Sequence, residues 1–368
     1  MQSHSATDVA YMQHALQLAR GGLGYVSPNP LVGCVIVKDG QIVGQGYHQR
    51  FGGPHAEVYA LQEAGAQAQG AVLYVTLEPC SHTGKTPPCV EAVLRAGVGR
   101  VVMALRDPNP LVAGGGLARL QAAGTPVTIG VCAAEAQGLN EAFLKYITSR
   151  RPFVTLKCAM TLDGKIATCT GASRWITGSA ARQEVHRWRH ATDAILVGIG
   201  TVLQDDPLLT TRLPDGSGVN PLRVIVDSTL RLLPQAQVAD VTACRTLVAT
   251  TARASGERRQ QLQSQGLEVV TLPAYDDGRV DLDALWQYLG TRGIASVLVE
   301  GGATLSATLI QRRLVDKLLF FIAPKIIGGD GISVVEACGV QQMDQAIRLR
   351  DLTGQGIGED ILLQAYLA

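Results

Sequence analysis

Apolar residues in the first 146 positions fall into short runs that alternate between the period of a helix and that of a strand. Residues 11–20 have the helical period, while residues 31–37 and 41–47 are apolar runs joined by Asp39-Gly40, a pair typical of a β-hairpin turn. The same pattern predicts helices near 54–64, 87–97 and 138–146, and strands near 71–77 and 98–104. Alternating strands and helices indicate an α/β sandwich.

A second α/β rhythm follows a polar break at residues 149–152. A new strand is expected at 153–159, and apolar runs predict six more strands near 194–197, 223–227, 246–249, 268–272, 296–300 and 318–324. A chain of 368 residues exceeds what one hydrophobic core usually organises. We therefore expect two domains, residues 1–146 and 147–368.

Charge and composition narrow the classes of partner. The chain has 32 basic and 31 acidic residues, a net charge of +1, and no long basic run, so it lacks the electrostatic pattern of a nucleic-acid-binding protein. No segment approaches the roughly 18 to 20 apolar residues that a membrane-spanning helix needs. With no leader-like N-terminus, its eight cysteines are expected to be thiols or metal ligands in a cytoplasmic protein.

His55, Glu57, Cys80 and Cys89 form the pattern with the clearest chemistry. Zinc deaminases carry H-x-E followed by P-C-x-x-C, with the glutamate as a proton shuttle that does not bind the metal. Here His55 and Glu57 have the expected spacing, and each cysteine follows a proline, but eight residues separate Cys80 from Cys89. One imidazole and two thiolates leave an open zinc position for water.

Prolines near His55 and Cys89 place both residues at the expected beginnings of helices, where the backbone dipole favours thiolate and hydroxide. Glu57 would lie near the metal on the same turn of helix as His55 and transfer protons from the water to the substrate. The alternative is a zinc-free fold in which His55 is a satisfied polar residue and Glu57 a surface acid. The combination of three elements favours the zinc site.

These segments closely resemble the deaminase half of the bifunctional riboflavin-biosynthesis deaminase-reductase family. The matching segments are residues 28–33, 55–58, 76–89 and 107–110, and the long cysteine spacing belongs to the family. The resemblance implies a cytidine-deaminase-like three-layer α/β/α domain. It also implies contacts to a phosphorylated aminopyrimidine from Asn29, His82, Lys85, Thr86, Asp107 and Asn109.

The resemblance continues into the second half, at residues 157–165, 173–177, 200–210 and 299–305, and is weakest over 213–295. It implies a dihydrofolate-reductase-like α/β domain. From the residues alone, a strand ending at Glu300, the pair Gly301-Gly302 and a helix from Ala303 would suit a cofactor phosphate, although a plain strand-to-helix turn is equally compatible. The pattern is not G-x-G-x-x-G, so a Rossmann fold is poorly supported.

The resemblance also assigns residues of this half to a cofactor and a substrate. For NADPH they are Met160, Trp175, Thr201, Asp205, Ser228, Gly302, Ala303, Thr304, Leu305, Ser306 and Ala307. For the substrate they are Ser173, Arg189, Leu209, Arg212 and Glu300. Two of these are physically apt, because the guanidinium groups of Arg189 and Arg212 could bind a phosphate ester bidentately.

The resulting hypothesis is a cytoplasmic enzyme, expected to be a homo-oligomer, either a dimer or a tetramer, with two consecutive activities. Water activated by Zn²⁺ would deaminate a diaminopyrimidinone ribosylamino phosphate, and NADPH would then reduce its ribosyl group to ribityl. One alternative is a nucleoside or nucleic-acid deaminase fused to an unrelated reductase. A second is a zinc-stabilised binding protein, which would have no need of Glu57.

Overall fold

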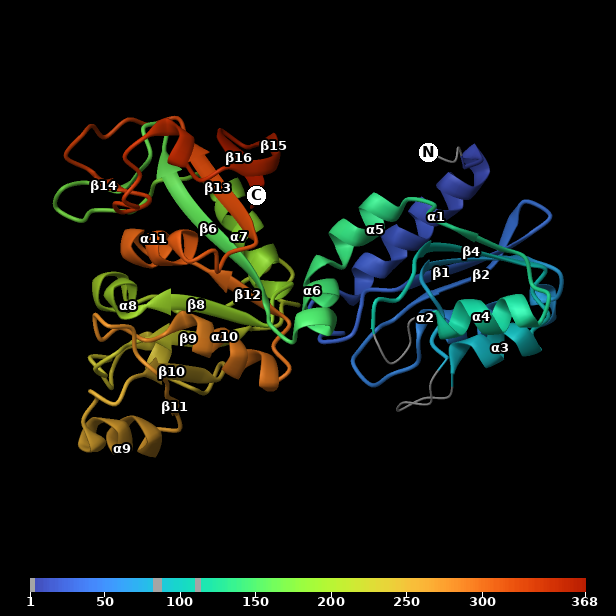
Figure 1. Cartoon of the computed structure of the whole chain (residues 1–368), viewed down its shortest axis with the longest axis horizontal. Helices are drawn as coiled ribbons and strands as arrows, with labels where there is room; N and C mark the ends of the chain where they lie inside the picture. Colours follow the sequence, from blue (N-terminus) through green and yellow to red (C-terminus); the bar gives the residue numbers. More distant parts are fainter. Residues whose placement is uncertain (1–3, 82–87, 110–113) are drawn as a thin grey trace. The chain divides into compact units, whose positions relative to one another are not determined.

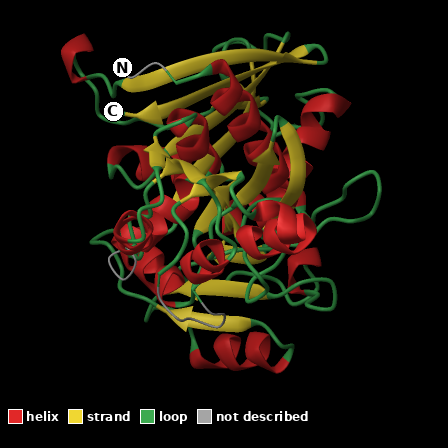
Figure 2. Cartoon of the chain, turned by 90° about the vertical axis from the view of Figure 1, so that its right-hand side faces the viewer, coloured by secondary structure: helices red, strands yellow, loops and turns green. Residues whose placement is uncertain are grey.

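The computed structural model describes residues 4–81, 88–109 and 114–368, and the chain divides into two compact units at Arg150/Arg151. Each unit has its own hydrophobic core and belongs to the mixed α/β class (Figures 1 and 2). The boundary expected at residue 147 falls within helix α6, Glu141–Ser149, which continues to the end of the first unit.

Unit 1 is built on a five-stranded sheet with the order β2-β1-β3-β4-β5. Its strands are β1 Gly33–Lys38, β2 Gln41–Tyr47, β3 Val72–Leu77, β4 Arg100–Leu105 and β5 Val127–Ile129. The hairpin β1–β2 is antiparallel, as expected from Asp39-Gly40, whereas β3, β4 and β5 run parallel to one another. The carboxyl ends of β3 and β4 therefore lie at the same edge of the sheet.

Helices cover both faces of this sheet, which confirms the expected three-layer α/β/α fold (Figure 1). They are α1 Ala6–Ala19 and α5 Ala133–Leu139 on one face, and α2 Ala56–Ala64, α3 Cys89–Arg95 and α4 Gly115–Ala122 on the other. The single helix expected at 138–146 is wrong. Asn140 separates α5 from α6, because its buried side chain bonds the backbone of Leu31 through both Oδ1 and Nδ2.

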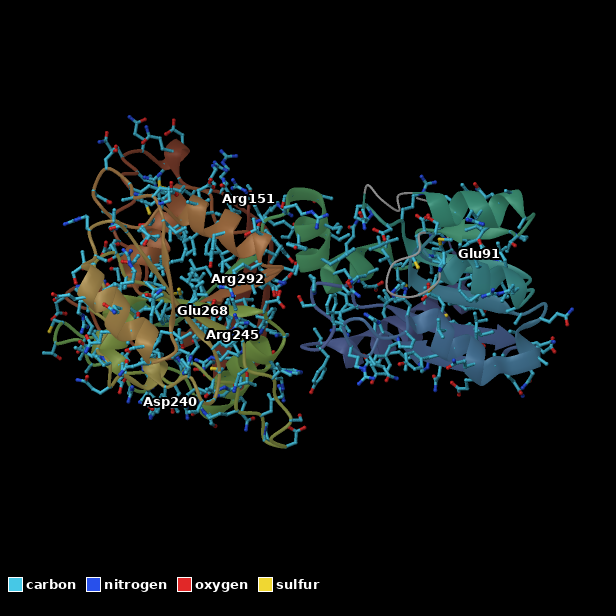
Figure 3. All side chains as sticks on the ribbon, turned by 90° about the horizontal axis from the view of Figure 1, so that it is seen from below. Glu91, Arg151, Asp240, Arg245, Glu268 and Arg292 are labelled. Atoms are coloured by element: carbon cyan, nitrogen blue, oxygen red, sulfur yellow. The ribbon has the colours of Figure 1, made fainter. Side chains whose placement is uncertain are left out.

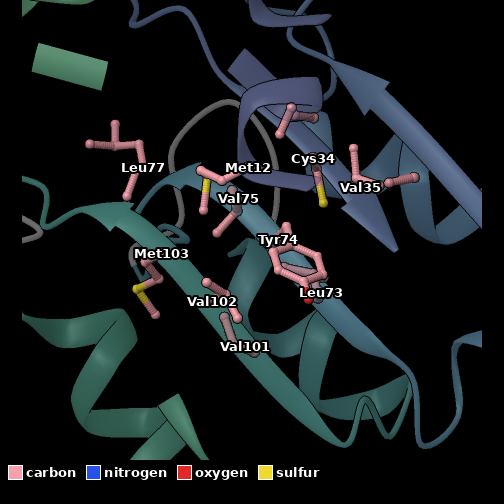
Figure 4. Close-up of a cluster of buried hydrophobic side chains, with 14 of the residues drawn as sticks. Met12, Cys34, Val35, Leu73, Tyr74, Val75, Leu77, Val101, Val102 and Met103 are labelled. Carbon is pink, nitrogen blue, oxygen red and sulfur yellow. The ribbon is translucent and has the colours of Figure 1, made fainter. Parts of the chain in front are cut away.

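The core of unit 1 lies on both faces of the central strands, against α1 on one face and against α2, α3 and α4 on the other, and Figure 4 shows part of it. Met12, Leu73, Val102 and Met103 are fully buried there. Cys34 is buried among them, and this burial raises the pKa of its thiol well above the ordinary value. Cys34 therefore behaves as a small apolar side chain.

Unit 2 contains a nine-stranded sheet with the order β11-β10-β9-β8-β12-β6-β13-β16-β15 and a two-stranded sheet, β14-β7. Its strands are β6 Phe153–Thr161, β7 Lys165–Ala167, β8 Ala194–Gly198, β9 Leu222–Val226, β10 Thr246–Thr250, β11 Glu268–Thr271, β12 Ser296–Val299, β13 Lys317–Ala323, β14 Ile332–Ser333, β15 Leu349–Ile357 and β16 Asp360–Leu367. From β11 to β13 all neighbouring strands are parallel, and β16 and β15 extend the sheet as an antiparallel hairpin.

Alternation along the strands divides the apolar residues of unit 2 between two faces. The helices are α7 Ser179–His190, α8 Ile199–Asp205, α9 Gly256–Ser264, α10 Leu282–Thr291 and α11 Ala303–Gln311. Leu196 of β8 belongs to the cluster that contains α10 and α11, whereas Ile195 and Val197 belong to the cluster that contains α8 and α9. Helices thus cover both faces of the parallel strands, as α/β folds require.

Arg223 of β9 is the largest fully buried side chain in the described chain, with 1% of its surface exposed. Its guanidinium donates to the carbonyl oxygens of Leu208, Gln237, Asp240 and Cys244, so it anchors two connections to the sheet, the one between α8 and β9 and the one between β9 and β10. Burial lowers its pKa. Among loops rich in backbone carbonyls, this cation replaces hydrogen bonds that water would otherwise supply.

Ion pairs at the surface are of a different kind (Figure 3). Glu268 pairs with both Arg245 and Arg292, and Arg151 pairs with Asp283 at the beginning of unit 2. Exposed pairs such as these contribute little to stability. No described helix is long and apolar enough to cross a membrane.

Candidate functional site

Unit 1 has a cavity of about 370 Å³ at the edge of the sheet where β3 and β4 end. Three regions expected from the sequence to carry chemistry meet there: the loop with Asn29, the beginning of α2, and the segments that follow β3 and β4. The predicted site residues that line the cavity are Asn29, His55, Glu57, Cys80, Asp107 and Asn109.

His55, Cys80 and Cys89 bring their ligand atoms within 4.8 Å of one another. His55 is the N-cap of α2 and Cys89 is the first residue of α3, so both lie at helix N-termini as the prolines predicted. Nδ1 of His55 is 3.2 Å from Sγ of Cys89 and 3.5 Å from Sγ of Cys80. Ligands bonded to one tetrahedral zinc at about 2.0–2.3 Å would have similar separations, so the donor set fits zinc.

The two thiols compete for one proton. A hydrogen bond from the Cys89 thiol, reinforced by His55, lowers the pKa of Cys80 to about 4, and the same contact together with burial raises the pKa of Cys89. The backbone N–H of Cys89 also donates to Sγ of Cys80 at 3.3 Å. The second thiolate needs a cation beside it, and a bound metal would supply that charge.

Glu57 is in the first turn of α2 and is 3% exposed. Its Oε2 has no hydrogen-bond partner among the described atoms although it is buried against the cavity. Burial raises the pKa of this carboxyl, with the charge of His55 opposing the shift. A buried carboxyl oxygen without a partner beside a three-ligand cluster is the arrangement expected of a proton carrier facing a substrate.

His48, which was not among the predicted site residues, orients the predicted substrate residue Asn29. Its ring is buried, and Nδ1 donates to the carbonyl oxygen of Pro54 at 2.9 Å because a carbonyl can only accept. Burial lowers the pKa of His48, which favours the neutral ring, and in a neutral ring with a proton on Nδ1, Nε2 accepts from Nδ2 of Asn29 at 3.1 Å. The Oδ1 end of the Asn29 amide is therefore the end turned away from His48.

Glu78 was part of a recognised motif but had no assigned role. It is buried at the end of β3, where it accepts from the backbone N–H of Asp107 and of Leu117 and so connects the end of β4 to α4. Asp107 accepts from the backbone N–H of Asn109 at 2.9 Å, which forms a tight turn at the cavity. The other predicted substrate residues, His82, Lys85 and Thr86, lie outside the described residues.

Unit 2 has a larger cavity, of about 690 Å³, at the carboxyl ends of its parallel strands. The predicted cofactor and substrate residues that line it are Thr201, Asp205, Ser228, Gly302, Ala303, Thr304, Leu305, Ser173 and Glu300. Those that do not line it are Met160, Trp175, Ser306, Ala307, Arg189, Leu209 and Arg212. Ser306 and Ala307 are buried in the packed side of α11, and the Trp175 ring is 65% exposed beneath the guanidinium of Arg182.

Glu300 follows β12 and is held between two cations. Its carboxylate accepts from Nε and Nη2 of Arg189 at 2.7 and 3.1 Å, and Nζ of Lys157 is 3.5 Å away. Burial alone would raise the pKa of Glu300, but the charges of Arg189 and Lys157 outweigh it and lower the pKa to about 2. Lys157 lines the cavity and was missed by the sequence reasoning, although it begins a recognised motif.

Arg189 and Arg212 meet at Thr210. Nη1 of Arg189 donates to the carbonyl oxygen of Thr210 at 3.0 Å, and Nη1 of Arg212 donates to its hydroxyl at 2.9 Å. Burial and these two positive charges lower the pKa of the neighbouring His186 to about 4. The region beside Glu300 therefore has a positive potential.

Family models match both units. The model "Cytidine and deoxycytidylate deaminase zinc-binding region" matches residues 5–105, and the model "RibD C-terminal domain" matches residues 152–363. The first of these contains His55, Glu57, Cys80 and Cys89, and the second contains Glu300 and the residues around the larger cavity.

Relatives match nearly the whole chain. The riboflavin biosynthesis protein RibD of Aquifex aeolicus is 43% identical over 356 residues, covering 97% of each chain, and that of Escherichia coli is 42% identical over 367 residues, covering 97% of this chain and 98% of the other. Among solved structures, RibD of Acinetobacter baumannii has a TM-score of 0.88 at 41% identity, covering 98% of this chain and 99% of that chain.

A Thermotoga maritima structure, a diaminohydroxyphosphoribosylaminopyrimidine deaminase/5-amino-6-(5-phosphoribosylamino)uracil reductase, has a TM-score of 0.86 at 37% identity, with 98% and 99% of the chains covered. These matches confirm the resemblance seen in the motifs and exclude both a fusion with an unrelated reductase and a binding protein without activity. The chain belongs to the RibD family of riboflavin-biosynthesis proteins, as a bifunctional enzyme that joins a zinc-dependent deaminase to a reductase of the NADPH-using type.

Proposed function

We propose that unit 1 deaminates 2,5-diamino-6-ribosylamino-4(3H)-pyrimidinone 5′-phosphate and that unit 2 reduces the ribosyl group of the product with NADPH. The final product would be 5-amino-6-ribitylamino-uracil 5′-phosphate. The observation that carries the proposal is the smaller cavity, in which the three-ligand cluster, a buried glutamate and amide side chains face one space. A structural metal site would have no use for such a cavity.

For the first reaction, His55, Cys80 and Cys89 would hold the zinc, with Nδ1 of His55 as its nitrogen donor. When bound, zinc supplies Lewis-acid activation of water. Glu57 takes a proton from the attacking water, gives it to the ring nitrogen, and carries a second proton to the amine, which leaves as ammonia. Burial raises the pKa of Glu57, which makes its carboxylate a stronger base for taking the proton from water.

Substrate recognition in unit 1 follows from the orientation of Asn29. Because His48 accepts from its Nδ2, Asn29 offers Oδ1 to a ligand and would select an N–H edge of the pyrimidine. Asp107 and Asn109 would contact the substrate from the turn after β4. For His82, Lys85 and Thr86, contacts to the substrate and its phosphate are proposed from the resemblance alone.

For the second reaction, Glu300, Ser173 and Lys157 would lie beside the ribosyl chain. Because Nε and Nη2 of Arg189 both donate to the Glu300 carboxylate, we propose that Arg189 positions Glu300 and that Leu209 supports the loop that carries Thr210. Arg212 is exposed and uses only one terminal nitrogen in its bond to Thr210, so it is the guanidinium available for the substrate phosphate.

NADPH would lie across the beginnings of α8 and α11. Gly302 faces Thr201, because a Cβ at Gly302 would be 4.0 Å from Oγ1 of Thr201. Gly198 and Gly302 are the N-caps of these two helices, whose unpaired N–H groups suit the pyrophosphate. Asp205, Ser228, Ala303, Thr304 and Leu305 complete the lining, while Met160, Trp175, Ser306 and Ala307 remain proposals from the resemblance.

We also propose a cytoplasmic homo-oligomer. Strand β15 is an edge strand, and exposed apolar side chains gather on β15 and β16, namely Leu349, Leu352 and Ile361. An exposed apolar edge of this length is commonly covered by another chain. Light scattering should give a multiple of the 38.9 kDa chain mass, and a purely monomeric mass at micromolar concentration would contradict this proposal.

Mass spectrometry of the products tests the two reactions together. Without NADPH, the substrate should lose an amine and gain a carbonyl; with NADPH, the product should gain two further hydrogens. Chelation of zinc should abolish the first change and leave reduction of the previously deaminated compound intact, because the thiolates and His55 belong to unit 1 alone. An unchanged substrate mass under both conditions would refute the proposal.

Replacing Glu57 by Gln should reduce ammonia release by about 10²- to 10⁴-fold, because the amide cannot carry the proton. Zinc content, measured by atomic absorption, should stay at the wild-type level. Glu63→Gln is the matched control, since Glu63 is exposed on the same helix, and it should retain wild-type turnover. Full ammonia release by Glu57→Gln would show that another group moves the proton.

Glu300→Gln should destabilise unit 2 by roughly 3 kcal/mol at neutral pH, because Arg189 loses its buried counter-ion. The pKa of Glu300 is lowered to about 2. The ionised carboxylate therefore contributes its full stabilisation at pH values above the ordinary pKa of glutamate, and this stabilisation is lost as the pH falls below that pKa. The difference from wild type should therefore be constant from pH 6 to 8 and shrink below about pH 4.5.

Urea denaturation followed by tryptophan fluorescence measures this effect in unit 2 alone, since all three tryptophans, Trp175, Trp188 and Trp286, belong to that unit. Glu359→Gln, which changes an exposed carboxylate of the same unit, is the control and should unfold like wild type. Equal stability of wild type and Glu300→Gln at pH 7 would contradict the predicted role of the ion pair.

A further inference from the structure

Three arginines line the larger cavity at the carboxyl ends of β9 and β10, away from Glu300. Arg231 follows β9, Arg253 follows β10, and Arg279 precedes α10. None of them is among the residues predicted to bind the cofactor or the substrate. Guanidinium groups from three separate segments that face one cavity indicate a site for an anion.

The arginines are separated from Glu300 by the width of several strands. Glu300 follows β12 and Arg253 follows β10, and the sheet order β10-β9-β8-β12 places three strand spacings between them. At about 4.8 Å for each spacing, the separation is about 14 Å. The beginnings of α8 and α11 lie in the region from Glu300 to Arg253. One extended ligand, with phosphates in its middle and at its far end, could therefore contact Glu300, the two helix N-termini and the arginines.

Arg253 is the cation least compensated by the protein. Arg279 pairs with Asp277 at 2.6 Å, and Arg231 is 3.9 Å from the buried carboxylate of Asp227. Among the residues that the structure describes, Arg253 has no ion pair with a carboxylate, and it is exposed. Its positive charge is therefore available to a ligand.

The turn before α10 is shaped around Arg253. Gly278 has φ +80°, and a Cβ at this position would lie 2.0 Å from Nη1 of Arg253. Its left-handed conformation favours glycine, and the missing side chain leaves the space that the guanidinium occupies. The same turn presents Arg279, whose contact with Asp277 through Nε and Nη2 leaves Nη1 for another acceptor.

Ser228 connects the two arginine segments. Its Oγ accepts from the backbone N–H of Val280 at 3.1 Å, and its carbonyl oxygen accepts from Oγ1 of Thr251 at 2.8 Å. Oγ1 of Thr251 in turn accepts from the backbone N–H of Arg253 at 3.3 Å. The hydroxyl hydrogen of Ser228 can then be donated to a ligand between Arg253 and Arg279.

We infer that Arg253 and Arg279, with Ser228, bind the phosphate monoester on the adenosine ribose of NADPH and make unit 2 selective for NADPH over NADH. The inference rests on the proposed binding of NADPH across α8 and α11. A dianionic monoester matches two guanidinium groups and one hydroxyl, whereas the bare ribose hydroxyl of NADH would leave both cations without a partner.

Isothermal titration calorimetry of the full chain with NADPH, NADH and 2′,5′-ADP measures this selectivity without turnover. Arg253→Met should weaken binding of NADPH and 2′,5′-ADP by roughly 10- to 100-fold, because charge-assisted hydrogen bonds are lost, and should change NADH binding less than about threefold. Arg253→Lys, which keeps the positive charge but cannot form bidentate hydrogen bonds, should recover part of the affinity. Arg245→Met, at the opposite end of β10 and paired with Glu268, is the control and should bind like wild type.

The outcomes separate this subsite from the proposed function. Unchanged NADPH affinity in Arg253→Met, or equal weakening of NADPH and NADH, would overturn the subsite while leaving the reductase proposal intact. Wild type that binds neither dinucleotide would instead contradict the proposed cofactor site. Selective loss of NADPH and 2′,5′-ADP affinity would establish the subsite.

Discussion

Parallel strand pairing determines where the chemistry of this chain can occur. Parallel neighbours end at the same edge of a sheet, so residues that follow different strands converge although they are far apart in sequence. Cys80 and Asp107 meet after β3 and β4 in unit 1, and Ser228 and Glu300 line one cavity after β9 and β12 in unit 2. Each strand also passes into a loop or helix there, which exposes backbone N–H groups to the ligand.

The deaminase chemistry could be predicted from sequence because it depends on short spacings. His55 and Glu57 share one helical turn, and the prolines beside His55 and Cys89 correctly placed both residues at the beginnings of helices. The α/β class and the positions of the central strands of unit 2 were also predictable from apolar runs. What these patterns share is that their information lies within one element.

Features that depend on contacts between distant residues were missed. Nothing near Arg189 in the sequence indicates that Glu300, 111 residues later, accepts from its Nε and Nη2. The break at Asn140 depends on the buried backbone of Leu31, and the β15–β16 hairpin contains glycines and polar residues that hide its strand period. In each case the partner that decides the structure is absent from the local pattern.

Glu57 and Glu300 show how the same side chain acquires opposite chemistry. Glu57 has a raised pKa because burial dominates, whereas Glu300 has a lowered pKa because Arg189 and Lys157 dominate. Glu300 stays ionised throughout the neutral range and has no proton to give. Reduction adds a proton as well as a hydride, so the acid in unit 2 must be a group other than Glu300, and its identity sets the pH range over which the second reaction can keep pace with the first.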